Sequence, residues 1–265
     1  MLRLAVSRKA RRVPLSEKPR LLVSRCLLGD AVRYDGGHKL NATLRDQIAL
    51  EHALVPMCPE VEAGMGTPRP AIDLFDTHEQ IRALDRAGHV DWTDGLSRVA
   101  KGIVRRLQTH PVDGCVWKAK SPSCGWGTAK RYDASGDFEQ ADGLVAAEVS
   151  AAFAGLPMID ERGLEDPEER SIFEAAVAIM FLRRTETVWP DNDWSATILN
   201  VVCKSETLRP TSEGTTPQLS WPELALRLRG CSMEARRGFA TSSRAVHRTI
   251  GAVIAGAEVP LKSER

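Results

Sequence analysis

The chain has 265 residues, of which 43% are hydrophobic and 27% are charged. These fractions are typical of a globular protein, and the formal net charge of +1 gives no overall electrostatic reason to bind DNA or a membrane surface. No stretch approaches the ~18–20 consecutive apolar residues that a membrane span requires. Six cysteines are too few for a disulfide scaffold and no export signal precedes them, so we expect reduced thiols in a cytoplasmic protein.

The first segment, residues 1–19, is rich in Lys and Arg and lacks the apolar core of a secretory signal. We interpret it as a basic N-terminal extension that is exposed to solvent. The alternatives are an organellar presequence and an arm that contacts an anionic partner.

Short apolar runs alternate with helical patterns from residue 20 onward. The predicted strands cover 20–24, 53–57, 114–119 and 156–159. The predicted helices cover 41–50, 93–110, 144–153 and 166–184. The last helix has a good capping sequence, because Asp166 can accept backbone N–H groups and Pro167 suits the first helical position. This alternation predicts an α/β fold with a mostly parallel sheet and flanking helices, in one domain over residues 20–184.

Residues 185–265 differ in composition, since they are rich in turn-forming residues. Only 223–229 and 242–257 have helical patterns there. We expect a small, irregular or helical C-terminal region that is partly ordered, and its sequence indicates no role.

Three cysteines occupy equivalent places in the predicted sheet. Cys26, Cys58 and Cys124 each follow a predicted strand within a few residues. Ligands of open α/β sheets gather outside the carboxyl ends of the parallel strands, so the three thiols can meet in one crevice. Cys115 lies inside a predicted strand, and we expect it to pack as a small apolar side chain.

The sequence around Cys58 restricts the backbone. Pro56 and Pro59 bracket the thiol, and Glu60 follows it closely enough to reach the same crevice. Arg69 comes after a glycine-containing turn, where it could orient a carbonyl or phosphate group. Arg33, Tyr34 and Asp35 form a polar group after Cys26, either as a surface turn or as a loop that contacts substrate.

Four motifs resemble the YbbK-type family, a domain-of-unknown-function family that is associated with thiouracil desulfidases carrying a 4Fe–4S cluster. The motifs are SRCLLGDAVRYDGGHK, VPMCPEVEAGMGTPRP, WKAKSPSCG and YD…G…ADGLVAAEV, within roughly residues 20–184. The resemblance implies that Cys26, Cys58 and Cys124 bind the cluster and leave one iron open. It also implies that Glu60 is the catalytic carboxylate and that Ser121 assists it.

One branch of this family carries a second, helical domain and removes sulfur from 4-thiouridine in tRNA. VEAGMGTPR and residues 157–184 are similar to that branch, whereas the sequence after Arg184 differs from its partner domain. The resemblance therefore implies a thiolated base or nucleoside as the substrate, with tRNA as a further possibility. The expected reaction is a hydrolysis of the thiocarbonyl group that releases hydrosulfide, with Glu60 accepting a proton from water.

Three other functions are compatible with the same residues. The thiols, with Cys115 as a fourth ligand, could hold a structural zinc ion in a non-catalytic binding module. A cysteine-nucleophile enzyme would need a histidine beside Cys58 or Cys124, and none of the three cysteine motifs contains one next to its cysteine. An RNA-binding protein could use the basic residues 1–19.

Overall fold

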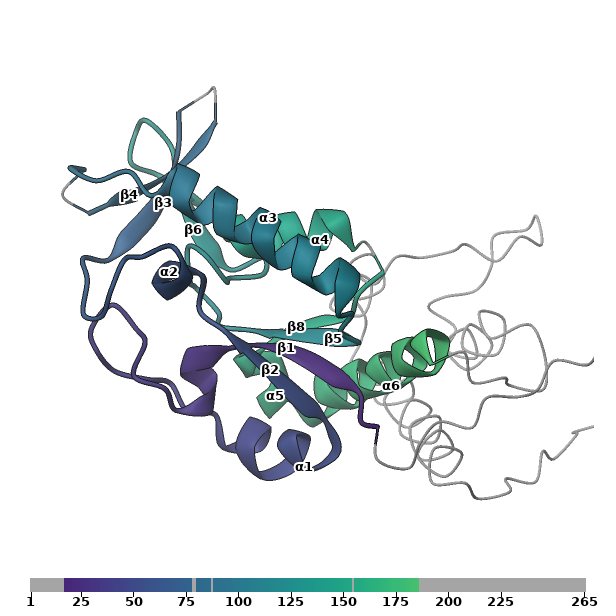
Figure 1. Ribbon diagram of the computed structural model, residues 1–265. Helices are drawn as coiled ribbons and strands as arrows, with labels where there is room; N and C mark the ends of the chain where they lie inside the picture. Colours follow the sequence, from purple (N-terminus) through teal and green to yellow (C-terminus); the bar gives the residue numbers. More distant parts are fainter. Residues whose placement is uncertain (1–16, 78–79, 87, 154, 186–265) are drawn as a thin grey trace, which may run out of the picture.

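The computed structural model describes residues 17–77, 80–86, 88–153 and 155–185 (Figure 1). Most of the predicted basic extension, residues 1–16, and the predicted C-terminal helices at 223–229 and 242–257 lie outside the described residues. Within the described part of the chain, no helix is long and apolar enough to cross a membrane.

Four parallel strands form the central sheet, called sheet A. They are β1 (Arg20–Ser24), β2 (Ala53–Met57), β5 (Gly114–Trp117) and β8 (Met158–Asp160), in the order β2-β1-β5-β8. Every neighbouring pair is parallel, so their carboxyl ends share one edge. The predicted parallel α/β sheet is therefore confirmed, and Pro56 lies in the edge strand β2, where a missing backbone N–H is tolerated.

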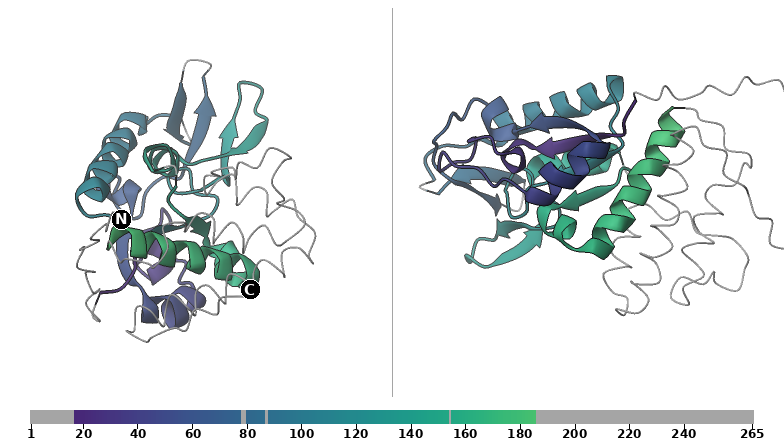
Figure 2. Two further views of the ribbon diagram at one scale, coloured as in Figure 1. Left: turned by 90° about the vertical axis from the view of Figure 1, so that its right-hand side faces the viewer. Right: turned by 90° about the horizontal axis from the view of Figure 1, so that it is seen from below.

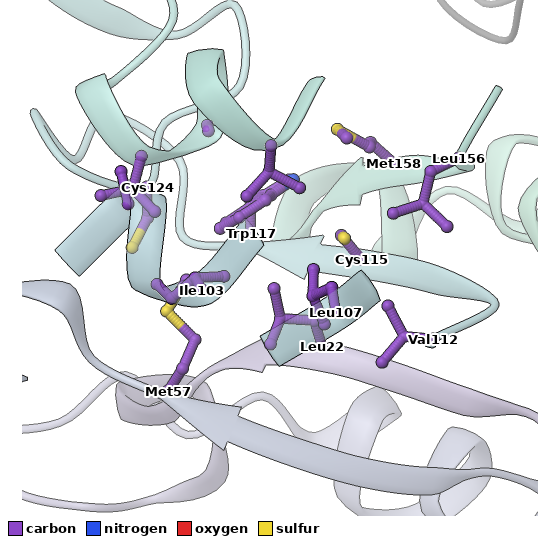
Figure 3. Close-up of a cluster of buried hydrophobic side chains, with 14 residues drawn as sticks. Leu22, Met57, Ile103, Leu107, Val112, Cys115, Trp117, Cys124, Leu156 and Met158 are labelled. Atoms are coloured by element: carbon purple, nitrogen blue, oxygen red, sulfur yellow. The ribbon is translucent and has the colours of Figure 1, made fainter. Parts of the chain in front are cut away.

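Helices α3 (Thr93–Thr109) and α4 (Leu144–Ala152) cover one face of sheet A (Figure 1). Side chains that alternate along the strands, among them Leu22, Cys115 and Trp117, pack against them in one buried cluster. Figure 3 shows this cluster, with Cys124 and Met57 at one end and Cys115 further along the sheet, beyond Trp117.

Four helical elements cover the opposite face of sheet A. They are a π-helical turn (Leu44–Ile48), α1 (Ala49–Glu51), α5 (Glu161–Glu165) and α6 (Pro167–Arg184). Leu21, Val23 and Val116 point to this face and pack with Phe173 and other residues of these helices. The Asp166 side chain accepts hydrogen bonds from the N–H groups of Glu168 and Glu169, which confirms the predicted cap of α6.

A second sheet, called sheet B, was not expected from the sequence. Its strands are β3 (Ile72–Asp76), β4 (Ile81–Asp85), β6 (Ala129–Tyr132) and β7 (Phe138–Ala141), in the order β4-β3-β6-β7. It consists of two antiparallel hairpins joined by a parallel β3–β6 pair. Figure 2 shows both hairpins projecting from one side of the fold.

Candidate functional site

The three predicted cysteines lie at the carboxyl ends of neighbouring strands of sheet A. Cys26 is in a short 3-10 helix (Arg25–Leu28) that directly follows β1. Cys58 follows β2 and is the N-cap of α2 (Pro59–Glu62), with Pro59 at the first helical position. Cys124 follows β5 after a tight turn. The fold therefore brings together three thiols that are far apart in sequence.

A cavity of about 340 Å³ opens at this edge of the sheet. Its lining contains eight of the nine residues predicted from the sequence, and they come from four separate segments: Cys26, Arg33, Tyr34, Cys58, Glu60, Arg69, Ser121 and Cys124. Asp35 is the ninth predicted residue, and the described lining of the cavity does not include it. It lies beside the cavity, where it accepts hydrogen bonds from the Gly37 N–H and from Arg33.

Burial makes all three thiols hard to ionise in the absence of a metal. It raises the pKa of Cys26 to about 11, and the charge of Cys58 adds to this effect. Burial also raises the pKa of Cys58 and raises that of Cys124 well above its ordinary value. Nearby groups oppose these shifts, since Lys118 and Arg33 lower the pKa of Cys26 and a hydrogen bond with Ser24 lowers that of Cys124. A bound metal would take over this compensation, because thiolates bind metals in the ionised form.

Ser121 stabilises the turn that carries Cys124. Ser121 Oγ accepts hydrogen bonds from the backbone N–H groups of Ser123 and Cys124, at 3.2 and 3.1 Å. The carbonyl groups of Pro122 and Ser123 accept N–H groups at the start of α4. Glycine is required at position 125, because a Cβ atom there would lie 2.7 Å from the Ser121 carbonyl oxygen. The turn therefore fixes Cys124 against both α4 and the strand.

Glu60 is held from both sides of its carboxylate. Arg69 donates from Nε and Nη2 to Oε2, at 2.9 and 2.5 Å, and Ser123 Oγ donates to Oε1 at 3.0 Å. The Glu60 side chain keeps 13% of its surface exposed, so it can still meet a molecule in the cavity. These hydrogen bonds fix the position of the Glu60 carboxylate at the edge of the cavity.

Arg69 was expected to face a substrate, but its guanidinium is directed mostly at the protein. Its side chain is 3% exposed, and it also donates to the carbonyl oxygens of Val32 and Gly66, at 3.0 and 2.8 Å. Its own backbone N–H donates to the Tyr34 carbonyl. Arg69 thus links the loop after Cys26, the loop after α2 and the Glu60 carboxylate.

Four further residues at this site were not among the predicted site residues. Ser123 is fully buried and contacts Glu60, which lies 63 positions away in sequence. Lys118 donates to Glu161 at 2.5 Å, and Glu161 also accepts the Ala119 N–H. Ser24 accepts the Lys118 N–H at 2.9 Å. The only sequence signal for Ser123 is its place between Ser121 and Cys124. Glu161 is the first residue of α5, directly after the neighbouring strand β8, so its contact with Lys118 depends on the order of strands in the sheet.

Cys115 does not share the cavity. It is completely buried in β5, beneath α3 and α4, and the described lining of the cavity does not include it. Among the described residues, no three or more His, Cys, Asp or Glu side chains lie close enough together to bind a single metal ion. Around one tetrahedral zinc ion, sulfur ligands would lie about 4 Å apart.

A comparison with known protein families identifies the family of this chain. The family model of 2-thiouracil desulfurase matches residues 21–161, which is more than half of the chain. The chain belongs to this family. The matched range includes all three cysteines and Glu60, and it ends before α6.

Two individual proteins are similar to this chain. The uncharacterised protein YbbK of Bacillus subtilis (strain 168) is 30% identical over 151 residues, which is 55% of this chain and 98% of YbbK. A solved structure described as the 4Fe–4S-dependent thiouracil desulfidase TudS is 28% identical and covers 56% of this chain and 95% of that one, with a TM-score of 0.45. Both matches cover nearly the whole of the other protein and a little more than half of this chain.

Proposed function

We propose that the chain is an enzyme that replaces the thiocarbonyl sulfur of a thiolated pyrimidine with oxygen and releases hydrosulfide. The substrate would be thiouracil, or 4-thiouridine as a free nucleoside or within tRNA. The observation that carries this proposal is that three buried thiols and an ion-paired glutamate line one cavity in a member of the 2-thiouracil desulfurase family.

The residues present fit a 4Fe–4S cluster with one open iron. Cys26, Cys58 and Cys124, which all line the cavity, would hold it. Thiolates are the usual ligands of such clusters, and three of them leave one iron without a protein ligand. When bound, the cluster supplies an open iron that acts as a Lewis acid toward a soft sulfur atom. Lys118 and Arg33 provide positive charge near Cys26.

The chain's own side chains would then carry the proton transfers. The Glu60 carboxylate accepts a proton from a water molecule, and the oxygen of that water attacks the thiocarbonyl carbon. Ser121 lines the cavity, and its oxygen already accepts two backbone N–H groups, so its own proton is available to a substrate. The overall change is C=S plus water to C=O plus hydrogen sulfide, which needs no net electron transfer.

Arg69 and Ser123 act in this scheme as positioning residues. They hold both oxygens of Glu60 before a substrate arrives, so the carboxylate does not reorganise during the reaction. Arg33 and Tyr34 lie on the cavity lining and are the candidates to contact the pyrimidine directly. Asp35 would act through Arg33, with which it forms an ion pair at 3.3 Å.

The measurement that tests the proposal is the iron and acid-labile sulfide content after anaerobic purification and reconstitution. We expect about four of each per chain and turnover of 2-thiouracil. The same preparation, given 4-thiouridine and thiolated tRNA, identifies the substrate form. Stoichiometric zinc without sulfide, and no turnover, would instead support the alternative of a non-catalytic zinc- or cluster-binding module.

Two further parts of the proposal concern the whole chain. We propose that residues 20–184 form the catalytic domain, because α6 packs on sheet A although the family match ends before it. Reduced thiols and an iron–sulfur cofactor both suit the reducing conditions of the cytoplasm.

A further inference from the structure

An aromatic row crosses sheet B in register. Phe75 of β3, Tyr132 of β6 and Phe138 of β7 are directly paired, and Arg82 of β4 continues the row beyond Phe75. The ring centroids of Phe75 and Tyr132 are 5.8 Å apart, and those of Tyr132 and Phe138 are 5.7 Å apart. Because directly paired residues point to the same face, the three rings form one continuous surface.

This row is on the face of sheet B that points away from α3 and α4. The alternate residues Leu74, Ala83 and Ala129 are buried and pack with side chains of α3 and α4 on the inner face. On the outer face, Phe138 is 51% exposed and the Lys130 ammonium lies 4.0 Å from the centroid of its ring. The outer face therefore presents aromatic rings and a cation in alternation.

The same face leads into the cavity that contains the cysteines. Asp73 lies two residues before Phe75 on β3, shares its face, and lines the cavity together with its ion-pair partner Arg86. Ala71 also lines the cavity, and four residues of strand place Phe75 about 13 Å from it. A stacked single strand of nucleic acid advances about 3.4 Å per nucleotide, so roughly four nucleotides span this distance.

Lys and Arg side chains gather at this junction, and five of them form ion pairs: Arg25 with Asp30, Arg33 with Asp35, Arg69 with Glu60, Arg86 with Asp73 and Lys118 with Glu161. Although the whole chain has a formal net charge of +1, the cavity lining holds seven Lys or Arg residues and only two Asp or Glu residues. The cations are Arg25, Arg33, Lys39, Arg69, Arg86, Lys118 and Lys120. Lys39 and Lys120 are exposed at the edge of the cavity, and Lys130 lies beyond it on sheet B. These three exposed lysines supply the positive charge that an extended polyanion would meet.

We propose that the outer face of sheet B binds single-stranded RNA whose thiolated pyrimidine enters the cavity. The bases that flank this nucleotide stack on Phe138, Tyr132 and Phe75, and the phosphates lie along the cations. Stacking on rings beside a basic groove is how proteins bind single strands with little sequence preference. The inference rests on the proposed function, and it places RNA binding on the catalytic domain itself rather than on residues 1–19 or 185–265.

The test is fluorescence anisotropy of a labelled, unthiolated oligouridylate of roughly eight nucleotides with the full-length chain. Phe138→Leu keeps an apolar side chain but removes the ring, and we expect binding to weaken by about tenfold. Phe138→Trp should restore or exceed the original affinity. Lys130→Gln should lower affinity and reduce the dependence of binding on salt concentration.

The control is Leu50→Ala, which alters an apolar residue that is 69% exposed on α1, away from sheet B. It should bind the oligonucleotide like the unaltered chain. Equal affinity of Phe138→Leu and Leu50→Ala, or no binding by the unaltered chain, would overturn the proposal; in the second case the face would be left for a protein partner. Turnover of free 2-thiouracil by the unaltered chain tests the proposed function separately, because it does not require this surface.

Discussion

Arg69 donates two hydrogen bonds to a single oxygen of Glu60, at 2.9 and 2.5 Å, and its side chain is almost completely buried beside that carboxylate. A buried cation with this geometry holds the carboxylate in one position. The pair also joins two loops, since the same guanidinium binds the Val32 and Gly66 carbonyl oxygens. Stability and proposed activity therefore depend on one side chain.

Replacement of Arg69 should reveal the cost of an unpaired carboxylate. We expect Arg69→Met to lower the free energy of unfolding by about 3 kcal/mol, because Glu60 remains charged without its partner. The double variant Arg69→Met with Glu60→Gln removes both charges and should regain most of this loss. Urea denaturation of the two variants measures the difference. If the double variant is as unstable as Arg69→Met, the guanidinium stabilises the fold through its carbonyl contacts instead.

Glu60→Gln should separate the proton transfer from cofactor binding. We expect 2-thiouracil turnover to fall by roughly a hundredfold or more, because the amide cannot accept a proton from water. Iron and sulfide content should stay unchanged, since the three thiols are intact. The matched control is Glu62→Gln, also in α2, which removes a carboxylate that pairs with Arg106 on the surface. Loss of iron in Glu60→Gln would show that Glu60 is structural.

The two serines of the turn before Cys124 should behave differently. Ser123→Ala removes the donor to Glu60 Oε1, and we expect turnover to fall by about tenfold with no change in iron content. Ser121→Ala removes the acceptor of the Cys124 N–H, so we expect lower turnover and also faster loss of iron to a chelator. Parallel kinetics and iron assays of both variants make this comparison. Identical effects would mean that both serines only shape the turn.

The sequence predicted sheet A and its edge because the signals were local. Apolar runs at β1, β2 and β5 each ended near a cysteine, and the amphipathic pattern of α3 and the cap of α6 were both readable within a few residues. The parallel arrangement then placed the thiols together, since all carboxyl ends share one edge.

Neither sheet B nor the partners of Glu60 could be predicted from the sequence, and the reasons are physical. Strands such as β6 (AKRY) and β7 (FEQA) have four residues and one exposed face, so their alternation is too short to tell from a loop. The Ser123 contact with Glu60 exists only after two loops have met. Arg69 looked like a substrate contact because the partner of a long cationic side chain cannot be read from its neighbours in sequence.

The catalytic domain should depend on α6, although the family match ends at residue 161. Phe173 is completely buried against sheet A, and Gly114 is so close to this helix that a Cβ atom there would lie 2.7 Å from Val177. We expect Phe173→Ala to lower the free energy of unfolding by about 3–4 kcal/mol, because it leaves a cavity in the core. Leu50→Ala is the exposed control and should change it by less than about 0.5 kcal/mol. Equal, small effects would mean that α6 is dispensable.

Removal of single thiols should decide which cysteines hold the cofactor. We expect Cys124→Ala to lose most of the bound iron, because Cys124 supplies one of the three thiols that the described residues place in the cavity lining. Cys115→Ala is the matched control. Its thiol is equally buried but lies in β5 beneath α3 and α4, so iron and sulfide per chain should remain at the level of the unaltered protein. Elemental analysis and the visible absorption of both variants after reconstitution measure this. A proportional loss of metal in Cys115→Ala would show that a fourth cysteine is a ligand, and the open position on which the proposed hydrolysis depends would not exist.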